Sequence, residues 1–156
     1  MTETKKKRLG EILIEDGALS PQSLEEALTH QKKEGGLIGQ ILIRLGYITE
    51  EDLIAAVGKQ LKIPYIPLSH YSVNSETTMK FGADFCRRHL LLPFDEDGKN
   101  VFLVMGDPLN DLAIGEVEKK CNLKSQIFIS TPTEILNMVE LIFNAAKKEG
   151  DVKKKD

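Results

Sequence analysis

The sequence predicts an α+β protein in which a helical lobe over residues 8–64 is followed by a small α/β lobe over 73–146. A pattern of apolar residues at helical spacing, interrupted by glycine, occurs twice before residue 64. After residue 72, short apolar runs of strand length alternate with amphipathic stretches of helix length. We therefore expect four helices, built as two helix-turn-helix repeats, in the first lobe. The second lobe is expected to hold about three strands together with helices.

The helical lobe is built from an internal repeat, because residues 37–60 follow the pattern of residues 8–31 at an offset of 29. Identity falls on 8 of the 24 aligned positions, where composition alone would give about one or two. The identical pairs are Gly10/Gly39, Ile12/Ile41, Leu13/Leu42, Ile14/Ile43, Gly17/Gly46, Leu24/Leu53, Ala27/Ala56 and Gln31/Gln60. A spacer of five residues, KKEGG, separates the copies.

Each copy is predicted to form two helices joined by a glycine turn. In the first copy, Gly17 suits the end of a helix, where a positive φ would strain other residues. Ser20 followed by Pro21 is typical of a helix start, because the hydroxyl caps free N–H groups and proline suits the first turn. Gly46 and Thr49 take the same places in the second copy.

The second lobe follows a predicted connector over 65–72, which has no helical period. Two apolar runs on either side of DEDGKN (95–100) predict a β-hairpin. The remaining expected elements are a helix from Asp107-Pro108 to about Cys121, a strand over 125–131, and an amphipathic helix that begins at Pro132. The charged residues 147–156 predict a disordered tail.

Composition and charge argue against several classes of protein. A net charge of −3 does not suit a protein that coats nucleic acid. No apolar run approaches the ~20 residues of a membrane span, and no secretory signal is recognisable, so we expect a cytoplasmic protein without membrane insertion. Cys86 and Cys121 lack metal-ligand spacing and indicate a reducing compartment. His30, His70 and His89 show no spacing for a metal or a catalytic base, so no metal site or catalytic group is predicted.

Several repeat residues allow both a structural and a ligand-binding role. Gly10 and Gly39 lie at helix starts, where glycine costs about 0.5–1 kcal/mol against alanine, so a tight helix crossing or a bound base or phosphate should require them. Arg8 is either a solvated charge or a contact to phosphate and guanine. The amides of Gln31 and Gln60 could cap a helix or read a base edge.

The two copies resemble the paired motifs of MshEN-type domains, the N-terminal domains of type II secretion and type IV pilus assembly ATPases. The family pattern is Arg-Leu-Gly, a glycine seven residues later, two leucines and a terminal glutamine, in two copies of 24 residues with a spacer of five. Residues 85–113, FCRRHLLLPFDEDGKNVFLVMGDPLNDLA, are similar to the family's second segment. Many such domains bind cyclic di-GMP. The resemblance implies ligand contacts from Arg8, Leu9, Gly10, Gly17, Leu24, Leu28 and Gln31 in the first copy, and from Ile38, Gly39, Gly46, Leu53, Val57 and Gln60 in the second.

The chain departs from the family at a few positions. The second copy has Leu37 where the first has Arg8, a difference that the family commonly shows too, and Ala18 is smaller than the aliphatic residue that usually follows the second glycine. A phosphate-binding loop needs G-x-x-x-x-G-K-[ST], and Gly98-Lys99 is followed by Asn100. We therefore expect no ATP turnover and no enzymatic activity, and either a stand-alone sensor or an excised domain.

Two functions follow from this interpretation. The first is a regulatory module that binds cyclic di-GMP through both copies, needs no other cofactor, and changes its docking on a protein partner in a secretion or pilus machine. The second is a docking domain of such a machine that acts without a ligand. Intact motif residues in both copies favour the first.

Overall fold

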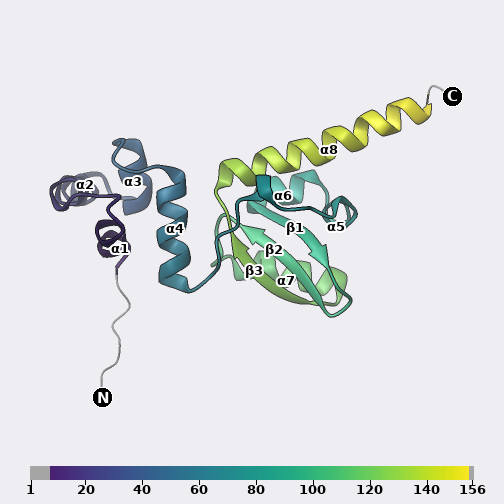
Figure 1. Ribbon diagram of the computed structural model, residues 1–156, viewed down its shortest axis with the longest axis horizontal. Coiled ribbons are helices and arrows are strands. Elements are labelled where there is room, and N and C mark those ends of the chain that lie inside the picture. Colours follow the sequence, from purple (N-terminus) through teal and green to yellow (C-terminus); the bar gives the residue numbers. More distant parts are fainter. Residues whose placement is uncertain (1–7, 155–156) are drawn as a thin grey trace, which may run out of the picture. The chain divides into compact units, whose positions relative to one another are not determined.

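The computed structural model describes residues 8–154, and they form two compact lobes divided between Ile63 and Pro64 (Figure 1). The first lobe is helical, and the second contains a three-stranded sheet with helices. This arrangement confirms the predicted α+β class.

The first lobe consists of two short helices and two longer ones that alternate along the chain. The helices are α1 (Leu9–Glu15), α2 (Pro21–Glu34), α3 (Ile38–Arg44) and α4 (Glu50–Leu61). Their apolar faces enclose a core whose buried members come in equivalent pairs from the two copies. These pairs are Ile12/Ile41, Leu13/Leu42, Leu19/Ile48 and Ala27/Ala56. Both copies therefore contribute the same positions to one core.

The helix ends of the first lobe follow from local sequence signals. Gly17 and Gly46 directly follow the C-caps of α1 and α3 and adopt φ of +77° and +80°, as predicted for glycine at this place. The Ser20 hydroxyl accepts a hydrogen bond from the backbone N–H of Ser23 at the start of α2. At α4, Thr49 and Asp52 exchange side-chain and backbone hydrogen bonds in a capping box. The predicted caps are confirmed in both copies.

The second lobe is organised around a mixed sheet with strand order β1-β2-β3. Strands β1 (Leu91–Glu96) and β2 (Asn100–Met105) form the predicted antiparallel hairpin, and β3 (Lys124–Ile129) runs parallel to β2. The other elements are η1 (Leu68–His70), α5 (Ser75–Met79), α6 (Ala83–His89), α7 (Asp111–Cys121) and α8 (Pro132–Lys154). Helix α8 packs on α6 and against β1 and β2, while α7 packs on β3. Helix α7 connects the parallel strands β2 and β3, as expected, since parallel strands need a long crossover connection.

Three features of the second lobe differ from the sequence-based predictions. Residues 65–72 are not a free connector, because Ile66 and Leu68 are buried in the core of this lobe and Tyr65 bridges to Ile129. The short helices α5 and α6 were not predicted. The prediction of a disordered tail over 147–156 is wrong for 147–154, where α8 continues, and residues 155–156 lie outside the described residues. Lysine and glutamate are good helix formers, so the charged segment extends the amphipathic helix before it.

The helix that follows β2 begins later than predicted. Asp107 and Pro108 form a turn after the strand, and α7 starts at Asp111 with Asn110 as its cap. The Asn110 side chain accepts a hydrogen bond from the backbone N–H of Ala113 at 3.2 Å. Asparagine at this position satisfies a first-turn N–H group, whereas Asp107 accepts from the N–H of Leu109 within the turn.

We predict that the two thiols of the second lobe react at very different rates. Cys86 is fully buried, and burial raises the pKa of its thiol to about 11, so little reactive thiolate forms near neutral pH. Cys121 is only half-buried. Brief treatment of the native chain with N-ethylmaleimide, followed by peptide mass spectrometry, should show modification of Cys121 and not of Cys86. Both should react in denaturant, and comparable native rates would contradict the burial of Cys86.

Candidate functional site

The two repeat copies form one body rather than two independent hairpins. The first copy supplies α1 and α2, and the second supplies α3 and α4. Helix α1 packs on α4, and α2 packs on α3, so each short helix lies against the longer helix of the other copy. The predicted site residues of each copy therefore lie on helices that pack against helices of the other copy.

Inside each copy, the early glycine packs against a leucine of the longer helix. A Cβ at Gly10 would lie 2.9 Å from Leu24 Cδ2, and one at Gly39 would lie 2.7 Å from Leu53 Cδ1. Distances below 3 Å are too short for real Cβ contacts, so a larger residue would push the end of the flexible leucine side chain aside. Of the two roles left open by the sequence, the structure therefore provides a packing contact, in which a leucine of the longer helix lies directly on the glycine.

The predicted site residues divide by exposure into a packed set and an accessible set. Leu28 keeps 41% of its surface exposed, although it is apolar. The other accessible positions are Arg8, Gly17 and Gly46. The buried or half-buried positions are Leu9, Gly10, Leu24, Gln31, Ile38, Gly39, Leu53, Val57 and Gln60. The packed set serves the lobe's interior, which leaves few motif side chains fully open to a ligand.

The glutamine that ends the first motif has a structural partner. The Gln31 amide Nε2 donates a hydrogen bond to the carbonyl oxygen of Gly36 at 3.0 Å. Gly36 belongs to the spacer and has φ of +100°, next to Gly35 with φ of +74°. Gln31 therefore ties the end of α2 to the spacer, while its amide oxygen is not used in this bond. Gln60 also has an interaction partner.

The two short helices begin without the side-chain caps that the longer helices have. Arg8 precedes α1 and Leu37 precedes α3, and neither side chain caps the first-turn N–H groups. The backbone of both residues is extended, with ψ of 153° and 133°. The local backbone of the two helix starts is therefore alike, and the difference between the copies lies in the side chain, a guanidinium in one and an exposed leucine in the other.

Polar contacts between the copies add to the apolar packing, and no motif in the sequence indicated them. Lys59 Nζ lies 2.6 Å from Asp16 Oδ1 and joins α4 to the end of α1. The Tyr47 hydroxyl donates a hydrogen bond to the Glu26 carboxylate, which raises the pKa of the tyrosine. Neither contact recurs at the equivalent positions of the other copy. A search for repeated residues could not find them, since repetition was its only guide.

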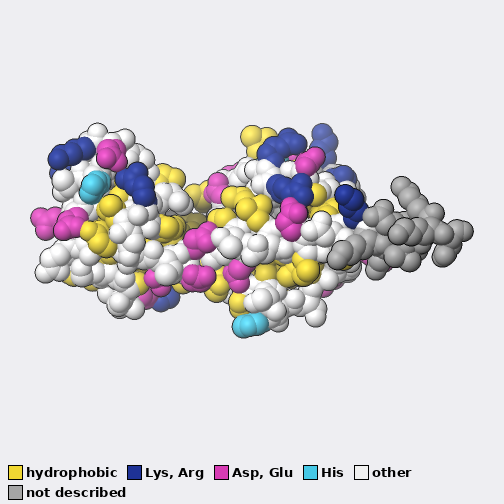
Figure 2. All heavy atoms as spheres, turned by 90° about the horizontal axis from the view of Figure 1, so that it is seen from above, with side chains coloured by type: hydrophobic (Ala, Val, Ile, Leu, Met, Phe, Trp, Pro, Cys, Tyr) yellow, Lys and Arg dark blue, Asp and Glu magenta, His cyan; other side chains and the backbone are white. Residues whose placement is uncertain are grey.

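The electrostatics of the lobes are mixed. Figure 2 shows carboxylates interspersed with Lys and Arg side chains on the visible face of each lobe.

Within residues 8–147, whose side chains the structure describes, no group of three or more His, Cys, Asp or Glu residues is placed to hold a metal ion. None of the described helices combines the length and the apolar character that a bilayer crossing requires.

Comparison with known proteins connects both lobes to one family. The model of the MshEN domain matches residues 61–149, which are mainly the second lobe. The type IV pilus assembly ATPase PilB of Myxococcus xanthus is 27% identical over 133 residues, covering 85% of this chain. PilB of Thermus thermophilus is 31% identical over 178 aligned residues, covering 91% of this chain. The chain spans only 24% and 20% of the length of these two proteins.

Solved structures extend the likeness to the repeats. A structure of MshE with cdg (cyclic di-GMP) superposes with a TM-score of 0.72 at 28% identity, covering 87% of this chain and 99% of the other. The N-terminal domain of XpsE gives a TM-score of 0.62 at 22% identity, covering 90% and 96%, and supports the fold alone. The lobes thus define a two-lobed domain related to the N-terminal domains of pilus and secretion ATPases. The chain belongs to the MshEN domain family.

We predict that Gly39→Ala stabilises the first lobe by less than its helix propensity alone would give. The gain in helix propensity is about 0.5–1 kcal/mol, and displacing the end of the Leu53 side chain offsets part of it. In a Leu53→Ala background the new methyl group has space, so the same change should stabilise more, and urea unfolding followed by circular dichroism would give the coupling between the two positions.

Gly115 of α7 is the matched control, because a Cβ there would meet nothing within 4 Å. Gly115→Ala should stabilise by about 0.5–1 kcal/mol. If Gly39→Ala stabilises the wild-type chain as much as Gly115→Ala does, the contact with Leu53 does not oppose an added methyl group.

Proposed function

We propose that this chain is a regulatory module that binds one molecule of cyclic di-GMP across both repeat copies. The observation that carries the proposal is the equivalence of the copies: the same helix ends and the same glycine–leucine contact recur at an offset of 29 residues within one packed lobe. Cyclic di-GMP has two chemically equivalent halves, so two equivalent surfaces in a constant relation to each other match its symmetry.

The similarity to MshE, whose structure was solved with cyclic di-GMP, supports this ligand. The contacts would come from the thirteen motif positions, with Arg8 as the charged group and Leu28 as an exposed apolar surface. A guanidinium suits both phosphate and guanine because it donates forked hydrogen bonds and stacks on planar groups. No metal or further cofactor is required.

Ligand binding would regulate how the module docks on a protein partner in a type IV pilus or type II secretion machine. The similarity to the two PilB ATPases supports this setting. The module would act in the cytoplasm, without nucleic acid and without inserting into a membrane. It would not hydrolyse ATP itself, since neither of its Gly-Lys pairs, Gly58-Lys59 and Gly98-Lys99, is followed by the Ser or Thr of a phosphate-binding loop.

A second candidate is a docking domain that acts without cyclic di-GMP. Two observations favour it. Gly10 and Gly39 have a packing role that needs no ligand, and the Gln31 amide already donates to the spacer. In this case the motif would persist because it holds the lobe together, and the partner would be bound in the same way with or without the nucleotide.

Calorimetric titration with cyclic di-GMP distinguishes the two candidates. We predict saturable binding, with GTP and ATP much weaker, and a loss of about 1.5–3 kcal/mol for Arg8→Ala, because a hydrogen bond to a charged group is removed. Arg44→Ala is the matched control, since Arg44 is an exposed arginine of the same lobe outside the motif and pairs with Glu34. Its removal should leave the affinity unchanged.

Absence of heat at ligand concentrations of tens of micromolar would favour the ligand-independent docking domain. Equal losses from Arg8→Ala and Arg44→Ala would show that general charge, rather than a contact of Arg8, attracts the nucleotide.

A single site that spans both copies also makes the spacer critical. We predict that three residues inserted after Gly35 abolish tight binding while circular dichroism still reports a folded chain, because the insertion changes the relation between the copies. The same insertion after Gly98, in the exposed β1–β2 turn of the other lobe, should leave binding intact. Gln31→Ala and Gln60→Ala should each weaken the same event at one ligand per chain. Two ligands per chain, or full affinity in the double-glutamine variant, would disprove the single site.

A further inference from the structure

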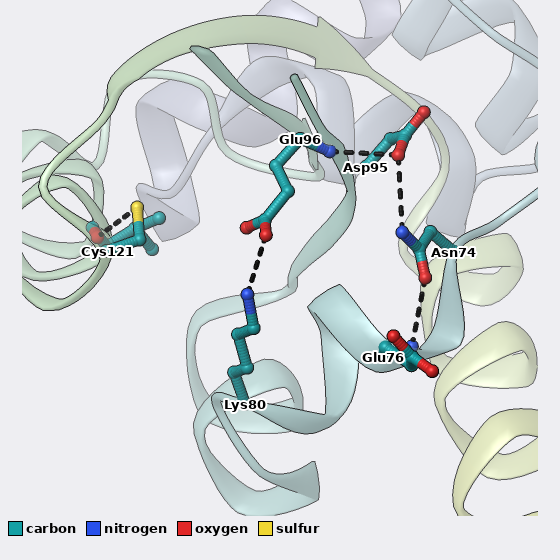
Figure 3. Close-up of polar contacts among 7 residues, drawn as sticks. Asn74, Glu76, Lys80, Asp95, Glu96 and Cys121 are labelled. Carbon is teal, nitrogen blue, oxygen red and sulfur yellow. Dashed lines mark hydrogen bonds and ion pairs between the residues drawn. The ribbon is translucent and has the colours of Figure 1, made fainter. Parts of the chain in front are cut away.

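The second lobe contains a pocket that is lined by no residue of the repeats. Its volume is about 540 Å³, which lies within the range of roughly 300–1,000 Å³ typical of small-molecule sites. It lies where the end of α5, the β1–β2 turn and the end of α7 come together. Figure 3 shows three residues from these elements, Lys80, Glu96 and Cys121, which all line the pocket.

One part of the pocket lining is apolar. Phe81 is 8% exposed and packs with its ring centroid 5.7 Å from that of Phe85. Leu123 and Cys121 are half-buried beside the core of the lobe. The Cys121 thiol donates to the carbonyl oxygen of Val117 at 3.1 Å, so its hydrogen-bonding capacity is used within α7. These three side chains offer an aromatic, an aliphatic and a sulfur surface that could contact a flat apolar group.

The rest of the lining is charged, and its charges are not balanced. Lys80 Nζ lies 2.6 Å from Glu96 Oε1, so these two groups neutralise each other. Lys120 Nζ lies over the Phe81 ring, 5.3 Å from its centroid. Among the described residues, no carboxylate lies within ion-pair distance of Lys120. The pocket therefore has one uncompensated ammonium group above its aromatic wall, although the whole chain has a net charge of −3.

We propose that this pocket binds a small amphipathic anion, a molecule with a flat apolar body and a single carboxylate, sulfonate or phosphate monoester group. The apolar body would lie mainly on Leu123 and Cys121, since Phe81 is buried, and the anionic group would pair with Lys120. Since Lys80 is paired with Glu96, Lys120 is the ammonium group of the lining that is left to pair, so the site favours one anionic group over two. This site is separate from the one assigned to cyclic di-GMP, because none of its residues belongs to the repeats.

The native thiol at the pocket makes the proposal testable on the full chain. The probe is 2-naphthalenesulfonate, and the readout is the rate at which N-ethylmaleimide modifies Cys121. Saturating probe should slow this reaction about tenfold, with a one-to-one binding curve. The matched cation 2-naphthylmethylammonium should not protect the thiol, since Lys120 repels it. Buried Cys86 stays unmodified throughout and reports that the lobe remains folded.

Two neighbouring lysines supply the matched variants. Lys120→Met removes the charge at the pocket and should weaken probe binding about tenfold, as expected for the loss of one charge-assisted contact. Lys119→Met removes the same charge from an exposed residue that does not line the pocket, and should leave binding unchanged. Equal effects of the two variants, or an unchanged rate at Cys121 under saturating probe, would overturn the proposal. Protection by cyclic di-GMP in place of the naphthalene probe would also overturn it.

Discussion

The first lobe depends on the contact between a helix-start glycine and a leucine of the longer helix, made once in each copy. Leu24 and Leu53 lie so close to Gly10 and Gly39 that a single added methyl group would collide with them. Each short helix packs on the longer helix of the other copy, so the buried pairs Leu13/Leu42 and Ala27/Ala56 lie in one common core. The positions that give the motif its recognisable pattern are therefore also those that determine the packing. Packing alone can account for the apolar part of the motif, so evidence for a ligand has to come from its exposed members.

The two lobes solve the problem of core formation differently. The first uses equivalent pairs of side chains from a repeated segment, whereas the second surrounds a mixed sheet with helices of unequal length. In the second lobe the buried polar groups are hydrogen-bonded: the Thr78 hydroxyl donates to the carbonyl oxygen of Pro93, at 2.7 Å, and the Ser130 hydroxyl to the Glu134 carboxylate, also at 2.7 Å. Such bonds make this core specific, because an unpaired buried hydroxyl would cost about 1–3 kcal/mol. The MshEN family model matches mainly this second lobe, which has no internal repeat.

Local signals in the sequence predicted the features that depend on local chemistry. Helix ends at Gly17 and Gly46 and caps at Ser20 and Thr49 are decided within a few residues, so their prediction needed no knowledge of the fold. The short helices α5 and α6 were missed because their position depends on contacts with β1 and α8, which lie farther along the chain. The role of Gly10 stayed open for the same reason, since its partner Leu24 is defined only once two helices cross. The ligand contacts of the motif stay a prediction, because exposed residues such as Arg8 do not take part in the packing of the lobe.

The exchange of helix partners between the copies has a consequence for assembly. Because α1 packs on α4 and α2 on α3, each copy buries much of its apolar face against the other copy. Only the spacer KKEGG makes the union of the copies intramolecular. If this spacer were too short to let α3 return along α2, the same contacts would form between two chains, and the lobe would become a domain-swapped dimer with an unchanged core. The spacer of five residues thus joins two copies that pack on each other within one chain, apart from any role in holding a ligand.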